Sequence, residues 1–129
     1  MSQHPGLWLT QIRLNPGQSL FSTRELVSVP DIHSIAPDLG PDDDPTVWMH
    51  LFAGCYSFWG GAVDFETGEF LGYVRDRSIA STGRWGLIPY SYLVGIRVPI
   101  KIEGVMTRIP LEREERFHPQ ALSEALRWT

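Results

Sequence analysis

Residues 96–111 carry the clearest structural signal in the chain, an alternation of apolar and polar side chains on both sides of Glu103-Gly104. A period of two residues is typical of a β-strand, because successive side chains of a strand point to opposite faces of the sheet. A two-residue loop at Glu103-Gly104 predicts a β-hairpin whose apolar pairs all fall on one face. The expected pairs are Ile102 with Val105, Ile100 with Thr107, Val98 with Ile109, and Ile96 with Leu111.

The aromatic- and glycine-rich stretch from Val47 to Val74 predicts three more strands. Their expected ranges are 47–53, 56–65 and 70–74. Within the first, Val47, Met49, Leu51 and Ala53 should share one face, and because both faces are largely apolar we expect the strand to be covered on both sides. Gly68 should take a positive φ in the hairpin loop between the second and third strands. Gly60 and Gly61 fall inside a strand, where glycines usually mark a bulge and less often the close approach of a ligand.

Helical signals lie at the two ends of the chain, with a further ambiguous one at Leu87 to Leu93. There Pro89 could open a short helix that Gly95 closes, or the segment could be an edge strand. Pro119 to Trp128 has a proline at its first position and an apolar stripe, which predicts a C-terminal helix. Ser22 and Glu25 have the spacing of a capping box and predict a short N-terminal helix that ends before Pro30. The polar segment 75–86 and the charged run 112–116 are expected to be a loop and a solvated linker.

Together these signals predict one α+β domain over residues 1–129. Its core would be a mainly antiparallel β-sheet of about five strands, with a C-terminal α-helix and a short N-terminal helix. Residues 28–46 hold several prolines and acids and are expected to form an irregular surface connection. A chain of 129 residues with 43% hydrophobic and 20% charged residues is long enough for one globular domain and too short for two.

Several features predict a cytoplasmic protein. Cys55 is the only cysteine, so no internal disulfide can form. The N-terminus lacks the basic start and apolar run of a secretory signal, and no run approaches the roughly 18 apolar residues of a spanning helix. No membrane association is expected.

Short motifs over residues 45–125 resemble a known family. They are Pro45-Thr46-Val47 with Leu51-Phe52, Leu71-Gly72-Tyr73-Val74, the run from Ile109 to Glu114, Phe117, and Leu122-Ser123-Glu124. The pattern resembles an uncharacterised domain-of-unknown-function family that is common on plasmids and other mobile elements. The chain departs from it in its proline-rich lead and at Ser57-Phe58, where only the following Trp59 matches. The resemblance implies a mobile-element or phage setting and implies no reaction.

The sequence does not predict an enzyme. Cys55 could act as a nucleophile with His50 and Asp64, yet a lone cysteine is more often a small buried hydrophobe. His4, His33, His50 and His118 lack the short paired spacing of a metal site, and the glycines fit no phosphate-binding loop. We therefore expect no catalytic residues, no metal and no cofactor, with a Cys55-dependent enzyme as the third-ranked function.

A binding face is predicted where aromatic residues and arginines gather. Its six candidate residues are Trp48, Trp59, Tyr73, Arg75, Arg77 and Trp85. Aromatic rings with arginines are typical of platforms that stack single-stranded nucleic acid. The same rings could simply fill the core of a small sheet protein.

Charge favours a protein partner over nucleic acid. The net charge is −4, with about −7 in residues 1–70 and about +3 in the rest, whereas backbone-driven nucleic-acid binding needs a positive field. An acidic half beside an arginine–aromatic half suits steered protein association. The preferred hypothesis is a small anti-defence type interaction protein that binds a host protein or a protein–nucleic-acid complex. The alternative is a single-stranded nucleic-acid-binding module that uses the same face.

Overall fold

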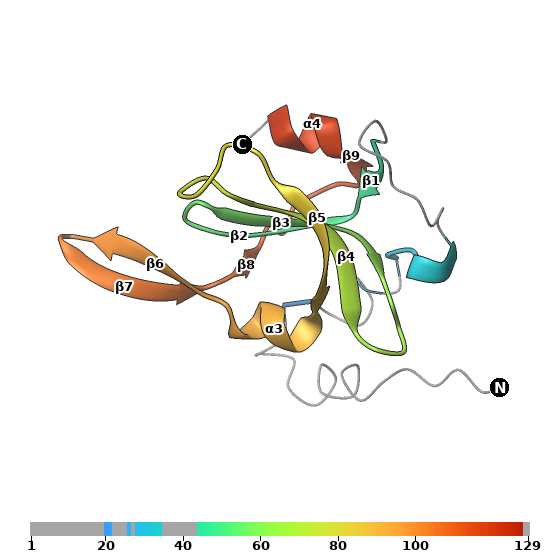
Figure 1. Cartoon of the computed structure of the whole chain (residues 1–129), viewed down its shortest axis with the longest axis horizontal. Coiled ribbons are helices and arrows are strands. Elements are labelled where there is room, and N and C mark those ends of the chain that lie inside the picture. The colour runs from blue at the N-terminus through green and yellow to red at the C-terminus, as the bar shows by residue number, and fades with distance from the viewer. Residues whose placement is uncertain (1–19, 22–25, 27, 35–43, 128–129) are drawn as a thin grey trace.

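The protein is an α+β domain built on a five-stranded antiparallel sheet, as the sequence predicted (Figure 1). The computed structural model describes residues 20–21, 26, 28–34 and 44–127. Four strands form a meander, and a late strand pairs with the first of them, so the sheet order is β5-β4-β3-β2-β8. The strands are β2 (Met49–Ala53), β3 (Tyr56–Val63), β4 (Glu69–Asp76), β5 (Arg84–Pro89) and β8 (Glu112–Arg113).

Two short helices lie on opposite sides of this sheet (Figure 1). Helix α3 (Tyr90–Gly95) follows β5 directly, and helix α4 (Leu122–Arg127) ends the described chain. A small second sheet, β1 (Thr46–Val47) with β9 (Gln120–Ala121), lies beside α4. Backbone and side chain of Ser123 both donate hydrogen bonds to the Asp44 carboxylate, which joins the start of α4 to the segment before β1.

The C-terminal helix is confirmed, but its predicted start at Pro119 is wrong. Gln120 and Ala121 are extended because they pair with Val47 and Thr46, and the helix begins at Leu122. The predicted N-terminal helix around Ser22 and Glu25 lies outside the described residues. Within residues 28–34 the chain forms a 3-10 turn, η2 (Ile32–Ser34).

The hairpin register predicted from the alternating pattern is confirmed. β6 (Arg97–Ile102) and β7 (Val105–Pro110) pair Ile102 with Val105, Ile100 with Thr107, and Val98 with Ile109. The ladder ends at Arg97 opposite Pro110, so the fourth expected pair, Ile96 with Leu111, lies just beyond it. Glu103 and Gly104 both have positive φ, +49° and +82°, as the two-residue turn requires. Figure 1 shows this hairpin projecting from the five-stranded sheet, and near its tip Ile102, Val105 and Met106 are exposed.

Two strands include residues that the sequence predicted as a loop or a linker. Residues 84–89 form β5, because their backbone extends the sheet beyond β4 in register from Val74 opposite Arg84 to Glu69 opposite Pro89. The predicted loop is wrong for residues 84–86, whereas both alternatives left open from residue 87 onward occur in turn, an edge strand to Pro89 and then helix α3.

The charged run 112–116 contains β8, which pairs with β2 through Phe52 opposite Glu112. Its composition predicted a solvated linker, and the hydrogen bonds to the neighbouring strand override that polar sequence.

One face of the sheet, here called the apolar face, holds the larger core. Leu51, Phe58 and Phe70 lie fully buried there. They pack against Phe21, Leu26 and Val29 from the N-terminal side and Tyr90 and Leu93 from α3. Rings stack within this core, with Phe21 and Phe70 centroids 5.7 Å apart.

The opposite face, here called the aromatic face, carries one row of rings across four strands. Direct register partners place His50 of β2 beside Trp59 of β3, Trp59 beside Tyr73 of β4, and Tyr73 beside Trp85 of β5. Helix α4 covers part of this row through Leu122 and Ala125, which form a second buried cluster with Val47 and Trp59.

Val47 does not share a face with Met49, contrary to the alternation predicted for residues 47–53. Val47 packs with Trp59 on the aromatic face, whereas Met49 lies in the core of the apolar face. The chain leaves the β2 ladder at Trp48, so that Thr46 and Val47 can pair with β9 instead. The predicted covering of both faces of β2 is confirmed, since Met49, His50, Leu51 and Ala53 are all buried.

The glycines of β3 and of the loop behave as predicted. The β3–β4 register shifts between Gly60 and Ala62, which identifies Gly61 as the extra residue of a bulge. Gly68 has a φ of +79° and closes the loop between these strands.

Candidate functional site

The six predicted binding residues are divided between core and surface. Trp59 is fully buried, so its place on a contact surface is wrong. Tyr73 and Trp85 are half-buried and continue the row outward from Trp59, with centroid separations of 6.1 Å and then 5.8 Å. The row is therefore an internal packing motif at its His50–Trp59 end and reaches the surface at Trp85.

The two predicted arginines differ in environment. The Arg75 guanidinium lies over the Trp59 ring, 5.2 Å from its centroid, which is a cation–π arrangement. Arg77 is exposed in the turn after β4, and its backbone N–H donates to the Cys55 carbonyl. The arginines thus do not form one rim: Arg75 belongs to the aromatic face and Arg77 to a turn at the end of the sheet.

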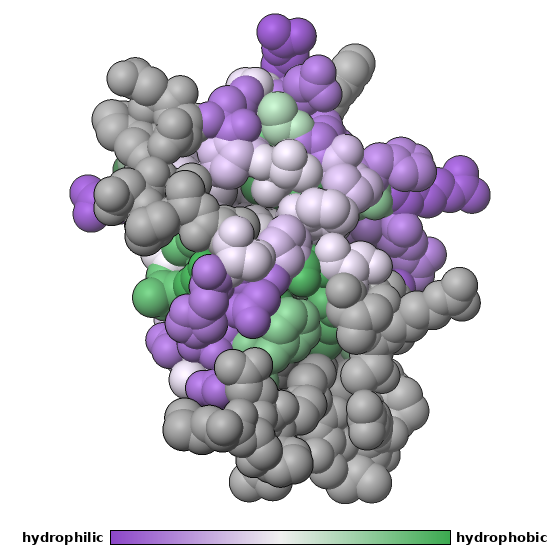
Figure 2. Space-filling view, turned by 90° about the vertical axis from the view of Figure 1, so that its right-hand side faces the viewer, coloured by the Kyte–Doolittle hydropathy of each residue, from purple (hydrophilic) through white to green (hydrophobic). Residues whose placement is uncertain are grey.

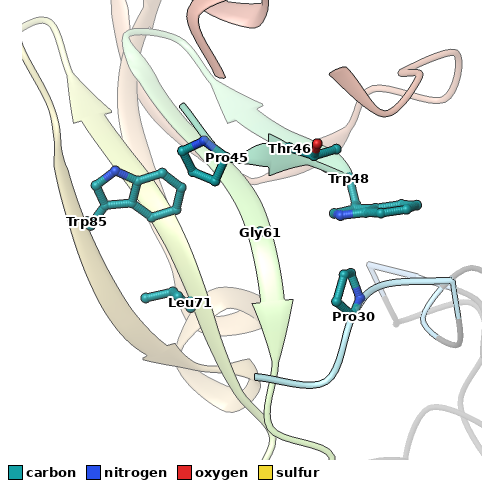
Figure 3. A pocket seen from close by; sticks show the side chains of 7 residues that line it. All are labelled: Pro30, Pro45, Thr46, Trp48, Gly61, Leu71 and Trp85. Carbon is teal, nitrogen blue, oxygen red and sulfur yellow. The ribbon is translucent and has the colours of Figure 1, made fainter. Parts of the chain in front are cut away.

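Trp48 and Trp85 come together across an open pocket (Figure 3). Their indole rings lie on opposite sides of it, with Gly61 and Leu71 between them. The pocket has a volume of about 270 Å³. Its lining residues come from the segment before η2, from the β1 region, and from β3, β4 and β5: Pro30, Pro45, Thr46, Trp48, Gly61, Leu71 and Trp85.

The pocket depends on the bulge in β3. A Cβ at Gly61 would lie 3.4 Å from the six-membered ring of Trp85, so the indole rests directly over the bare backbone of this glycine. The bulge expected at the strand glycines thus lies at Gly61, and the missing side chain there leaves room for the Trp85 ring. Trp48 is positioned separately, because its backbone N–H donates to the Gly60 carbonyl at 2.8 Å.

The chemistry of the pocket is apolar. Among the described residues that line it, none carries an ionisable side chain, and the polar side-chain groups are the Thr46 hydroxyl and the two indole N–H groups. Figure 2 views the side where η2 and β1 lie, next to Pro30 and Pro45. In this view, residues of intermediate hydropathy form the centre and hydrophobic ones are exposed below it. Hydrophilic residues lie at the top and right and also among the hydrophobic ones.

A second hollow of about 400 Å³ adjoins the first at Trp48. One side carries the charged residues Arg113 and Glu115, which belong to β8 and the turn after it. The remaining lining residues are Ser28, Val29, Met49, Phe117 and Pro119. Trp48 therefore separates an apolar pocket from a hollow with a charged rim.

His50 is the one buried polar side chain among the described residues, with 5% exposure. Its Nδ1 lies 3.0 Å from Glu114 Oε1 and its Nε2 lies 3.1 Å from Ser57 Oγ. Burial lowers the pKa of His50 below its ordinary value of 6.5, the Arg75 charge acts in the same direction, and the Glu114 hydrogen bond and charge oppose them.

The trio written from the sequence, Cys55 with His50 and Asp64, is not assembled. Both His50 nitrogens are engaged by Glu114 and Ser57, and Cys55 is exposed in the turn between β2 and β3. The Asp64 carboxylate instead accepts backbone hydrogen bonds from Glu66 and Thr67 in the next loop. Sequence reasoning missed Ser57 and Glu114, because 64 residues separate Glu114 from His50.

The described parts of the chain hold no group of three or more His, Cys, Asp or Glu side chains arranged to bind a metal ion. Over the same residues, no helix has both the length and the apolar character needed to span a membrane.

The fold and site thus describe a small α+β protein with an aromatic-walled apolar pocket. No protein-family model matches the chain, and neither a curated protein nor a solved structure matches it significantly.

Proposed function

We propose that this protein is a binding module for another protein, and that the Trp48–Trp85 pocket receives a bulky apolar side chain or a proline from a segment of that partner. The observation that carries the proposal is the pair of tryptophans on opposite sides of an open pocket, whose described lining residues include none with an ionisable side chain. Water in such a pocket makes few hydrogen bonds, so an apolar group that displaces it gains burial against both indole rings.

The size of the pocket supports an anchor side chain over a large ligand. Its volume of about 270 Å³ falls below the roughly 300–1,000 Å³ of pockets that enclose drug-sized molecules. Tryptophan is among the residues most enriched at the energetic centres of protein interfaces. Proline side chains of Pro30 and Pro45 add rigid apolar walls with little conformational entropy to lose on binding.

The surroundings of the pocket support a peptide segment as the occupant. The hollow on the far side of Trp48 offers Arg113 and Glu115 beside apolar residues, which is the mixed character of an interface rim. A partner segment anchored between the tryptophans could continue over Trp48 and make polar contacts there.

This arrangement favours a protein partner over single-stranded nucleic acid. A stacking platform needs exposed rings beside cations. Here Trp59 is buried and the Arg75 guanidinium lies over its ring, so this ring has no exposed face on which a base could stack. The resemblance of residues 45–125 to a mobile-element family supports a host protein met in the cytoplasm, in keeping with an anti-defence role.

A peptide-display selection tests the proposal. The full chain is immobilised and a random peptide library is selected against it, followed by affinity measurements with Trp85→Ala, Gly61→Ala and, as a matched control, Tyr92→Ala. Tyr92 is an aromatic residue of α3 that is 63% exposed and outside the pocket. We expect enriched peptides to share a bulky apolar residue or proline, and to bind Trp85→Ala at least about 10-fold more weakly.

Gly61→Ala separates pocket loss from unfolding. The new methyl group meets Trp85 at an ordinary contact distance, so the fold should persist while the pocket floor rises. Peptides that bind both pocket variants as tightly as Tyr92→Ala, or a selection that enriches no apolar anchor, would contradict the proposal.

A further inference from the structure

Ser57, His50 and Glu114 form a hydrogen-bonded relay on the aromatic face. The Glu114 carboxylate accepts from His50 Nδ1 at 3.0 Å. A carboxylate can only accept, so Nδ1 carries the proton and Nε2 is left as an acceptor for the Ser57 hydroxyl at 3.1 Å. Serine at Nε2 and an acid at Nδ1 is the arrangement by which a histidine base activates a serine nucleophile.

The imidazole is held in a single orientation. His50 stacks on Trp59 with centroids 4.8 Å apart and ring planes 5° apart, and Phe52 stacks on it at 5.5 Å. Phe117 contacts it from the segment after β8 at 6.1 Å. Rings on several sides exclude water and prevent rotation, which keeps Nε2 directed at Ser57.

An arginine neighbours the serine across the sheet. Arg75 is the direct register partner of Ser57 in the β3–β4 pair, so the two side chains leave the same face. Burial is the main cause of the lowered pKa of His50, and the Arg75 charge adds to it. A cation beside a nucleophile stabilises the negative charge that develops on a carbonyl oxygen under attack. A neutral histidine at pH 7 is likewise what a general base requires.

We propose that Ser57 is an activated nucleophile for ester-type acyl groups, with His50 as general base, Glu114 as its positioning residue and Arg75 as the cation for the oxyanion. Ser57 Oγ attacks the ester carbonyl carbon and its proton moves to His50 Nε2. The bond to the leaving oxygen then breaks, and that oxygen takes the proton. Water repeats the sequence on the acyl-serine, which releases the carboxylic acid and returns the proton to Ser57 Oγ.

This site is separate from the Trp48–Trp85 pocket, because none of its four residues lines that pocket. Ser57 is half-buried and the Glu114 side chain is 46% exposed, so the relay reaches solvent at both ends. Failure of either proposal therefore leaves the other standing.

The test uses an alkyl fluorophosphonate, which reports an activated serine by forming a stable bond from Oγ to phosphorus with loss of fluoride. The full chain is incubated with the reagent and the adduct is located by peptide mass spectrometry. We expect one adduct at Ser57, absent in Ser57→Ala. Ser78 is the internal control, because its hydroxyl donates to the Asp76 carboxylate and should stay unlabelled.

Glu114→Gln distinguishes a relay from a merely accessible serine. The glutamine amide can donate a hydrogen bond to His50 Nδ1, which permits the tautomer with its proton on Nε2. That tautomer cannot accept the Ser57 proton, so labelling at Ser57 should slow by about 100-fold or more. Glu112→Gln, an exposed carboxylate two residues earlier on β8, is the matched control and should label as the parent does. In the parent, labelling should persist below pH 6.5 and fall only when His50 protonates, given its lowered pKa.

Absence of an adduct at Ser57 in the folded parent overturns the proposal, and no variant is needed for that result. Equal labelling rates in the parent and Glu114→Gln, with matching circular dichroism spectra, would also overturn it, because Ser57 would then react without the relay.

Discussion

The two faces of the five-stranded sheet are built from alternate residues of the same strands and contain different chemistry. On the apolar face, Phe58 and Phe70 belong to a cluster of buried hydrophobic residues. On the aromatic face, the neighbouring Trp59 packs against His50 and the Arg75 guanidinium. Both Phe58 and Trp59 are fully buried, so burial alone does not separate them.

The difference shows how a small domain can place polar groups inside without losing its core. The apolar face gains stability from area removed from water and from close packing. The aromatic face also keeps a histidine and an arginine there, at a desolvation cost that hydrogen bonds and ring contacts offset. We therefore expect the apolar face to govern stability and the aromatic face to respond to pH and to reagents.

The largest expected effect is that of Phe58→Ala on the apolar face. Truncating this fully buried ring should lower the free energy of unfolding by about 3–5 kcal/mol, through lost burial and the cavity left behind. On the aromatic face, Trp59→Phe keeps a ring and should cost only about 1–2 kcal/mol. Urea unfolding followed by circular dichroism measures both. A larger loss for Trp59→Phe would reverse the assignment of the two faces.

A smaller effect is expected for Gly72→Ala, at a position of β4 where the neighbouring strand leaves no room for a side chain. The new Cβ would lie 2.4 Å from the Phe58 ring and 2.7 Å from the Trp59 carbonyl oxygen. Overpacking of this kind should cost about 2–3 kcal/mol. Gly86 is its direct partner on β5 and has open space around it, so Gly86→Ala is the matched control. The same urea experiment should show a change of less than about 1 kcal/mol for the control.

The smallest expected effect is on the pH dependence of stability. Burial lowers the pKa of His50 in the folded protein, with Arg75 acting in the same direction and Glu114 opposing it. The unfolded chain then binds more protons below pH 6.5, so the free energy of unfolding should fall as pH drops from 6.5 through the folded pKa. His50→Gln should remove this part of the dependence, whereas Phe58→Leu on the apolar face should retain it.

Thermal unfolding of these two variants between pH 5 and pH 7 measures the effect. If His50→Gln keeps the full pH dependence of the parent, another group is responsible and His50 does not couple the aromatic face to pH.

Local pattern was sufficient for some parts of this molecule. Alternating side chains around Glu103-Gly104 specified the β6–β7 register, because the strand period and the turn length leave one register with every apolar side chain on one face. Gly68 and the Gly60–Gly61 bulge could likewise be predicted, since a positive φ or an extra strand residue favours glycine wherever the strand lies.

Contacts between distant segments could not be predicted from the local sequence pattern. β8 lies in a charged run that forms a strand only because β2 offers it hydrogen bonds, and it brings Glu114 to His50. The pocket joins Pro30, Trp48 and Trp85 from three separate segments. Trp59 is buried in a cluster with Val47 from β1 and with Leu122 and Ala125 from α4. Periodicity encodes which way a side chain points along its own strand. Which strands become neighbours is settled by long-range packing and hydrogen bonding.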